Sequence, residues 1–200
     1  MGRRISADER RIALVAAALR VAARRGISHA TTRAIVAEAG MSLASFHYVF
    51  ESRDAFLAEV IRTVVDDELH AVLPDVEPAA TLRDTIASGL ERYLSHVRRE
   101  PGEELTMLEL TWHSLRTPEL AGLAGSQYES YRAFARAALE AAAGFHDCRW
   151  RIPVDDVARL LVSFTDGLTI DWLVHEDEAA SALIVGASAD AIASLAEAAS

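Results

Sequence analysis

The sequence predicts an all-α protein: an N-terminal head of three helices with a helix-turn-helix, followed by a body of roughly six helices. Three observations predict this class. The composition is 51% hydrophobic, with many Ala and Leu and only five Pro and ten Gly in 200 residues. Apolar residues recur at helical spacing along most of the chain, and no run of β-branched residues alternates at strand spacing. Around Gly40, two short helical segments flank a tight turn.

The first expected element is an amphipathic helix over residues 7–25, which Gly26 ends because glycine readily takes the left-handed conformation of helix termini. Its apolar residues recur every three or four positions and are expected to face inward: Ile12, Val15, Leu19 and Ala22.

Two short helices follow around the turn. Thr31 is expected to cap the first, Gly40 to end it, and Ser42 to cap the second, because hydroxyl side chains accept hydrogen bonds from the first free backbone N–H groups. Phe46 and Phe50 lie one turn apart and form the buried edge of the second helix. The side chains left to point outward are Leu43, Ala44, Ser45, His47 and Tyr48.

Ser52 caps the next helix, which opens with Arg53 and Asp54. We expect a division between a domain over 1–52 and a C-terminal domain over 53–200. In the body, Pro and Gly residues mark the ends of the predicted helices. The expected helices are 53–73, 81–99, 103–116, 119–143, 153–175 and 177–198, with a linker at 74–80 and a loop at 145–152.

Charge separates the head from the body. The chain has 20 Arg and no Lys against 30 acidic residues, a formal charge of −10. Residues 1–50 hold eight Arg and three acids, which is +5, and the remainder is −15. A basic head on an acidic body favours attraction to nucleic-acid phosphates, although arginines that merely solvate a helix face would also fit.

Residues 7–57 resemble the N-terminal domain of the TetR family of transcriptional regulators. The matching residues agree in order and spacing without a gap: Gly26, Thr31, Ile35, Ala39-Gly40-Met41-Ser42, Phe46, Phe50, Ser52-Arg53-Asp54 and Leu57. Residues 111–120 (TWHSLRTPEL) also resemble the corresponding segment of the subgroup that includes the betaine-pathway repressor.

The resemblance implies which residues contact double-stranded DNA. Leu43, Ala44, Ser45 and Tyr48 would face base edges, beside the helix cap Ser42, whereas Thr31, Arg33, His47 and Arg53 would hold phosphates. The family usually has Tyr where His47 stands and often Lys where Arg53 stands. Histidine donates a hydrogen bond over a shorter reach, and arginine keeps the positive charge.

In the body, aromatic and polar residues suggest a pocket for an unknown small-molecule effector, with ordinary core as the alternative. The candidates are Tyr93, Met107, Trp112, Tyr131 and Phe164. The helix over 153–175 is apolar nearly all round, so a partner subunit is expected to cover part of it in a homodimer bound to an inverted repeat. The expected interface comprises Leu161, Phe164, Leu168, Trp172, Leu183 and Ile192.

Other classes of function find little support in the sequence. The single cysteine, Cys148, precludes an internal disulfide and is consistent with a cytoplasmic protein. No apolar stretch is long enough to span a membrane, and no catalytic, cofactor or metal motif appears. Glu109 and His113 lie one turn apart, as metal ligands can, but a solvated face explains them more simply. The alternatives left open are a DNA-binding regulator without an effector, or a helical carrier or enzyme.

Overall fold

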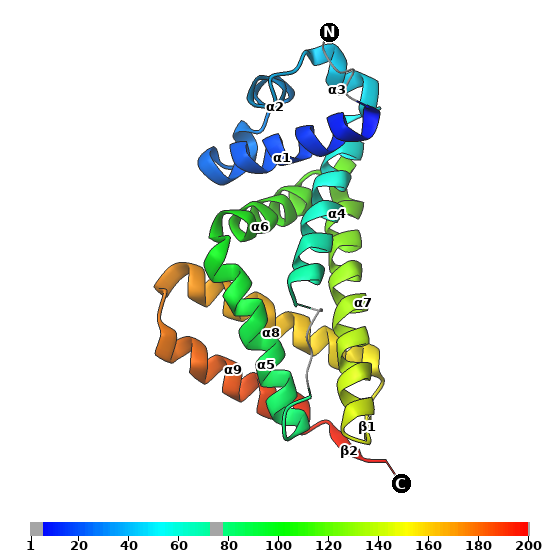
Figure 1. The fold of residues 1–200 in the computed structure, drawn as a ribbon, viewed down its shortest axis with the longest axis vertical. Coiled ribbons are helices and arrows are strands. Elements are labelled where there is room, and N and C mark those ends of the chain that lie inside the picture. The colour runs from blue at the N-terminus through cyan, green and yellow to red at the C-terminus, as the bar shows by residue number, and fades with distance from the viewer. Residues whose placement is uncertain (1–5, 73–77, 200) are drawn as a thin grey trace. The chain divides into compact units, whose positions relative to one another are not determined.

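The computed structural model describes residues 6–72 and 78–199, without the side chains of 65–72, 119 and 121. Within these ranges the chain forms nine α-helices, which confirms the all-α class (Figure 1). Most of the expected linker at 74–80 lies outside the described residues. The elements are α1 (Ala7–Arg25), η1 (Ile27–His29), α2 (Thr32–Glu38), α3 (Leu43–Val49), α4 (Arg53–Val72), α5 (Leu82–Arg99), α6 (Pro101–Arg116), η2 (Pro118–Leu120), α7 (Ala121–Phe145), β1 (Cys148–Trp150), α8 (Val154–His175), α9 (Glu178–Ala193) and β2 (Ala196–Ala198).

The chain forms two compact units. Unit 1 contains residues 1–66 and 102–127, and unit 2 contains residues 67–101 and 128–200. Unit 1 therefore combines the three head helices with α6, a helix that follows them by more than fifty positions in the sequence.

Two short strands, β1 and β2, lie where the sequence predicted a loop and the end of a helix. We expected a loop over 145–152 and a final helix to 198, but α9 ends at Ala193, and β2 pairs antiparallel with β1. Trp150 lies opposite Ala196, and Arg149 forms an ion pair with Glu197 at 2.7 Å. Three-residue strands carry no alternating pattern that a sequence can show, and here pairing satisfies backbone groups just beyond two helix ends.

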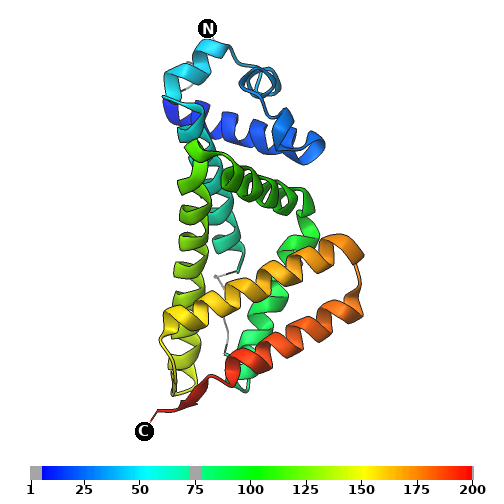
Figure 2. The same cartoon turned by 180° about the vertical axis from the view of Figure 1, so that it is seen from behind.

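The core of unit 2 lies where α5, α8 and α9 pack together. Figures 1 and 2 show α8 and α9 folding back on each other as a hairpin alongside α5. Buried side chains from the three helices fill this core: Leu94, Val157, Ala158, Leu168, Val185, Ala189 and Ile192. Apolar burial of this kind supplies most of the stability of a helical unit.

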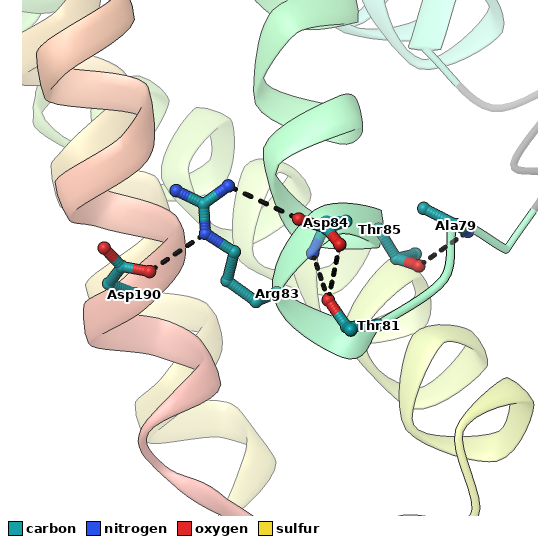
Figure 3. Close-up of polar contacts among 6 residues, drawn as sticks. All are labelled: Ala79, Thr81, Arg83, Asp84, Thr85 and Asp190. Atoms are coloured by element: carbon teal, nitrogen blue, oxygen red, sulfur yellow. Dashed lines mark hydrogen bonds and ion pairs between the residues drawn. The ribbon is translucent and has the colours of Figure 1, made fainter.

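Polar contacts at the start of α5 fix that helix against α9 (Figure 3). Arg83 donates to Asp190 of α9 at 2.9 Å and reaches Asp84 at 3.4 Å. Thr81 caps α5 by accepting the Asp84 N–H at 3.1 Å, and Thr85 accepts the N–H of Ala79 at 3.0 Å. The ion pairs are exposed, so their role is to define the register of α5 on α9 more than to add stability.

Candidate nucleic-acid interface

Three phenylalanine rings form the centre of the head. Phe46, Phe50 and Phe56 are each at most 2% exposed, with ring centroids 4.9–5.4 Å apart in tilted and edge-on arrangements. Leu14 and Ile35 are fully buried in the same unit. The sequence identified Phe46 and Phe50 as the inner edge of α3 but missed Phe56, which joins α4 to this core. Aromatic clusters of this geometry hold helices in a fixed orientation.

Of the four residues of α1 expected to face inward, Val15 and Ala22 are buried, Leu19 is half-buried and Ile12 is exposed. Ile12 is 69% exposed, and the buried stripe runs through Leu14, Val15, Ala17, Ala18, Val21 and Ala22. The expected inner face at Ile12 was therefore wrong. So many residues of α1 are apolar that their spacing fits more than one face, and only packing against α2 and α3 selects between them. A capping box formed by Ser6 and Glu9 begins the helix, in addition to the elements that the sequence predicted.

The turn between α2 and α3 follows the sequence rules closely. Gly40 has φ +63, in the left-handed region that favours glycine, and Met41 N–H donates to Val36 C=O at 2.8 Å. The hydroxyls of Thr31 and Ser42 accept the N–H groups of Ala34 and Ser45, both at 3.2 Å. The expected caps and turn are confirmed, and they set α2 and α3 at an angle across a very short connection.

The outer face of α3 is open. Tyr48 is 71% exposed, Leu43 is 44% exposed, and Ala44 and His47 are exposed beside them. Ser45 is half-buried and shares a hydrogen bond with Ser42 at 3.1 Å. The guanidinium of Arg10 lies 5.5 Å from the ring centre of Tyr48, a cation–π contact that places a positive charge at the edge of this face.

Two further pairs of arginines in the head differ in their partners. Arg20 and Arg24 bind Glu38 at 2.9 and 2.5 Å, and these hydrogen bonds, Arg20's first, lower the pKa of the Glu38 carboxyl. Arg33 and Arg53 are exposed beside the caps of α2 and α4. Only the second group has a charge that no acidic residue in the described part of the chain neutralises, so it is the better suited to phosphates.

Arg53 has a structural contact as well as an exposed charge. It donates one hydrogen bond to the carbonyl of Ala30 at 3.2 Å, next to the cap residue Thr31. A guanidinium has five N–H donors, so most remain for another acceptor. Arg11 acts differently: it closes the C-terminal end of α3 by donating to Val49 C=O at 3.1 Å and stacks over Phe50 at 4.9 Å.

Glu109 links α6 to the head within unit 1. Its carboxylate accepts the N–H of Ile27, and a Cβ built on Gly26 would lie 3.3 Å from the Glu109 oxygens. Gly26 has φ +83, so this position needs glycine for its backbone conformation too. The expectation that Glu109 is part of a plain solvated face is corrected: although exposed, it binds the first residue of η1.

The expected effector residues fall in both units. Met107 is buried in unit 1, whereas Trp112, in the same unit, is 57% exposed. Tyr93, Tyr131 and Phe164 are half-buried against the core of unit 2. Their role in a pocket remains a prediction.

The expected interface residues of α8 and α9 also differ in exposure. Leu168 and Ile192 are buried in the core of their own unit and have almost no surface to offer a partner. Leu161, Phe164 and Trp172 are half-buried, and Leu183 is 73% exposed. Further apolar side chains that the sequence did not single out are exposed on α8: Leu160, Ile170 and Val174.

The described residues contain no helix long and apolar enough to cross a membrane. They also contain no group of three His, Cys, Asp or Glu side chains placed to hold a metal ion.

Comparison with known protein families defines the class of this fold and site. Residues 14–60 match the bacterial regulatory proteins of the tetR family, and residues 82–197 match the C-terminal domain of BetI-type transcriptional repressors. The chain belongs to the TetR family of transcriptional regulators. The resemblance of residues 111–120 to the betaine-pathway subgroup agrees with the second match.

Individual relatives extend the comparison over most of the chain. The HTH-type nicotine-responsive transcriptional repressor HdnoR of Paenarthrobacter nicotinovorans is 25% identical over 175 residues, covering 88% of this chain and 89% of that protein. The crystal structure of the multidrug binding protein EbrR complexed with imidazole is 28% identical, with a TM-score of 0.64 and coverage of 94% and 93%. A TetR-family regulator from Rhodococcus sp. shares the fold, with a TM-score of 0.76, 20% identity and coverage of 94% and 98%.

Proposed function

We propose that this protein is a repressor that binds an inverted-repeat DNA operator as a homodimer and is released from it by a small-molecule effector. Its membership of the TetR family makes it a ligand-responsive DNA-binding transcriptional regulator. The observation that carries the finer proposal is the open outer face of α3, supported from behind by the three buried phenylalanines. Because its target is chromosomal DNA, we place the protein in the cytoplasm.

The dimensions of α3 suit the major groove. An α-helix with its side chains is about 10–12 Å across and the major groove is about 12 Å wide, so the groove can hold α3. Leu43 and Ala44 have no side-chain donor, so we assign them to thymine methyl groups, whereas the Ser45 and Tyr48 hydroxyls suit the polar edges of bases. Thr31, Arg33, His47 and Arg53 surround this face and are assigned to the phosphates that fix its position.

A homodimer is supported by the exposed apolar side chains of the C-terminal hairpin. Leu160, Ile170 and Val174 on α8 and Leu183 on α9 are at least 41% exposed, which is unfavourable for side chains of this size unless a partner covers them. A two-fold axis would place the two α3 helices about one turn of DNA apart, roughly 34–36 Å. This spacing requires an operator with two inverted half-sites.

Release by an effector is supported by relatives whose names record such responses. HdnoR is a nicotine-responsive repressor, and EbrR is a multidrug binding protein. In the proposed mechanism the effector favours the conformation in which the two heads are wrongly spaced for the operator. Helix α4 carries this change to the head, since it begins at Arg53 and contributes Phe56 to the core.

Selection from random double-stranded DNA with the purified protein tests this proposal. The expected result is enrichment of one inverted repeat, bound by two subunits. A triple variant with Leu43, Ala44 and Tyr48 replaced by residues of different size should lose that preference while retaining weak, salt-sensitive binding to any DNA. If the folded wild-type protein enriches no sequence, the assignment of α3 as the base-reading helix is overturned.

A further inference from the structure

Asp166, near the middle of α8, is an acidic residue without a cationic partner in the described part of the chain. Its side chain is half-buried and accepts a hydrogen bond at 3.0 Å from the hydroxyl of Tyr128 on α7. In the described part of the chain this neutral hydroxyl is its polar partner, and the ion pairs of unit 2 involve other carboxylates. Even partial removal of an ionised carboxylate from water, without a cationic partner, costs free energy, and a bound cation would offset that cost.

Tyrosine side chains from α5 and α7 contact this part of α8. Tyr128 and Tyr131 lie one turn apart on α7, with ring centroids 5.7 Å apart and planes at 76°. One turn along α8 from Asp166, the hydroxyl of Thr169 hydrogen-bonds that of Tyr93, on α5, at 2.5 Å. The hydroxyls of Tyr93 and Tyr128 thus both bond side chains of α8, Thr169 and Asp166 respectively, which fixes the two tyrosines against this helix.

The surroundings of Asp166 and Tyr128 raise the pKa values of both side chains. Burial raises the pKa of Asp166, and the hydrogen bond from Tyr128 lowers it in part. Burial, together with the charge of Asp166, raises the pKa of Tyr128 to about 12, so the tyrosine remains a donor at neutral pH. A positively charged ligand beside Asp166 would favour the ionised carboxyl and remove the penalty that burial imposes.

We propose that Asp166, with Tyr128, Tyr131 and Tyr93, forms the recognition site for an organic cation, an amine or quaternary ammonium compound, as the effector of this regulator. The proposal deepens the proposed function and rests on it. Aromatic rings attract alkylammonium groups through their negative faces, and a partly desolvated carboxylate adds a direct charge interaction. An anionic ligand would be repelled by Asp166, and a neutral one would leave its charge unpaired.

Isothermal titration calorimetry with an isosteric pair tests the charge requirement. The probes are 3-hydroxyphenyltrimethylammonium and 3-tert-butylphenol, which have nearly the same shape and differ in charge. Tetraethylammonium and benzyltrimethylammonium extend the series to other sizes. With wild-type protein we expect the cation of the pair to bind at least about tenfold more tightly than its neutral counterpart, the ratio that a single partly buried charge interaction produces.

Two matched variants assign the effect to its residue. Asp166→Asn should weaken binding of the cation by about tenfold or more and leave the neutral compound unchanged. Asp156→Asn removes the same charge from an exposed position on the same helix and should change neither affinity. Equal affinity of wild type for the two isosteres, or no loss in Asp166→Asn, overturns the proposal. If Asp166→Asn does not fold, the comparison of isosteres on wild type decides alone.

Operator binding, followed in parallel by fluorescence anisotropy, distinguishes failure of the cation site from failure of the proposed DNA-binding function on which it rests. Wild-type protein that binds its selected operator but none of the three cations contradicts the cation site and leaves the DNA-binding function intact. Protein that binds the cations but no operator contradicts the proposed function and leaves the site standing. Displacement from the operator by the cation, lost in Asp166→Asn and kept in Asp156→Asn, supports both.

Discussion

Replacing Arg53 by Ala tests the contribution of the phosphate contact proposed for this residue. Arg53 is exposed at the first position of α4, and only one of its five N–H donors is used, by the carbonyl of Ala30. An exposed charge-assisted hydrogen bond contributes about 1 kcal/mol, so a dimer that loses one from each head should lose about 2 kcal/mol of DNA affinity. That change corresponds to a roughly 30-fold higher dissociation constant.

The salt dependence supplies a second, independent magnitude. Each phosphate neutralised by a protein cation contributes about 0.9 to the slope of log affinity against log salt concentration, so losing two contacts should reduce the slope by roughly 1.8. Fluorescence anisotropy with a labelled operator, at salt concentrations from about 50 to 200 mM, measures both quantities. The reduction should be the same for operator and for unrelated DNA.

Arg53→Lys is the matched control. Lysine keeps the charge but presents a point donor in place of the planar fork, so the salt slope should stay near that of wild type. Loss of the Ala30 contact in either variant should lower the free energy of unfolding by no more than about 1 kcal/mol, which urea unfolding would detect. An Arg53→Ala protein with an unchanged salt slope but an altered preference among operator bases would refute the phosphate assignment.

Four further changes test separate parts of the structure. Phe56→Ala empties the centre of the head and should destabilise the protein by about 3–5 kcal/mol, measured by chemical unfolding, whereas Phe56→Leu should lose less. Glu109→Ala removes the acceptor for Ile27 N–H and should lower stability by about 1 kcal/mol, with Glu109→Gln recovering most of it; equal losses would show that only charge matters. Leu183→Glu places a charge in the proposed interface and should convert dimer to monomer in sedimentation velocity, and a persistent dimer would exclude that face. Asp166→Asn should raise the thermal midpoint of the free protein at neutral pH: a carboxyl whose folded pKa is raised loses stability as pH rises from its ordinary value through the folded pKa, so the gain should vanish below that window.

The head was predictable because its rules are local. Thr31, Gly40 and Ser42 each act on backbone groups within a few positions, so their roles as caps and turn could be read directly from the sequence. Phe56 depends on tertiary packing and gave no such signal. Ile12 failed for a related reason, because in a helix with so many apolar residues the inward face is chosen by its neighbours and not by spacing.

The body was less predictable because residue type does not specify direction. Trp112 and Met107 were selected together as effector residues, yet one is mostly exposed and the other buried. Leu168 and Leu183 were both assigned to a dimer interface, although Leu168 completes the core of its own subunit. Asp166 went unnoticed because a lone aspartate in a helix has no sequence signature; its burial and its contact with Tyr128, 38 positions earlier, appear only in three dimensions.

The packing of α6 against the head helices within unit 1 limits how an effector can act on the DNA-binding head. A Cβ at Gly102 would lie 3.0 Å from that of Ala23 on α1, and Glu109 accepts the N–H of Ile27 in η1, so α6 contacts the segment formed by α1 and η1 at two points along its length. Interiors packed this closely transmit displacements more readily than they deform. A movement of α6 should therefore carry α1, α2 and α3 with it as one body. In the proposed dimer, effector binding would therefore change the spacing between the two heads and leave the outer face of each α3 intact. The released protein would then keep its sequence preference for a single half-site.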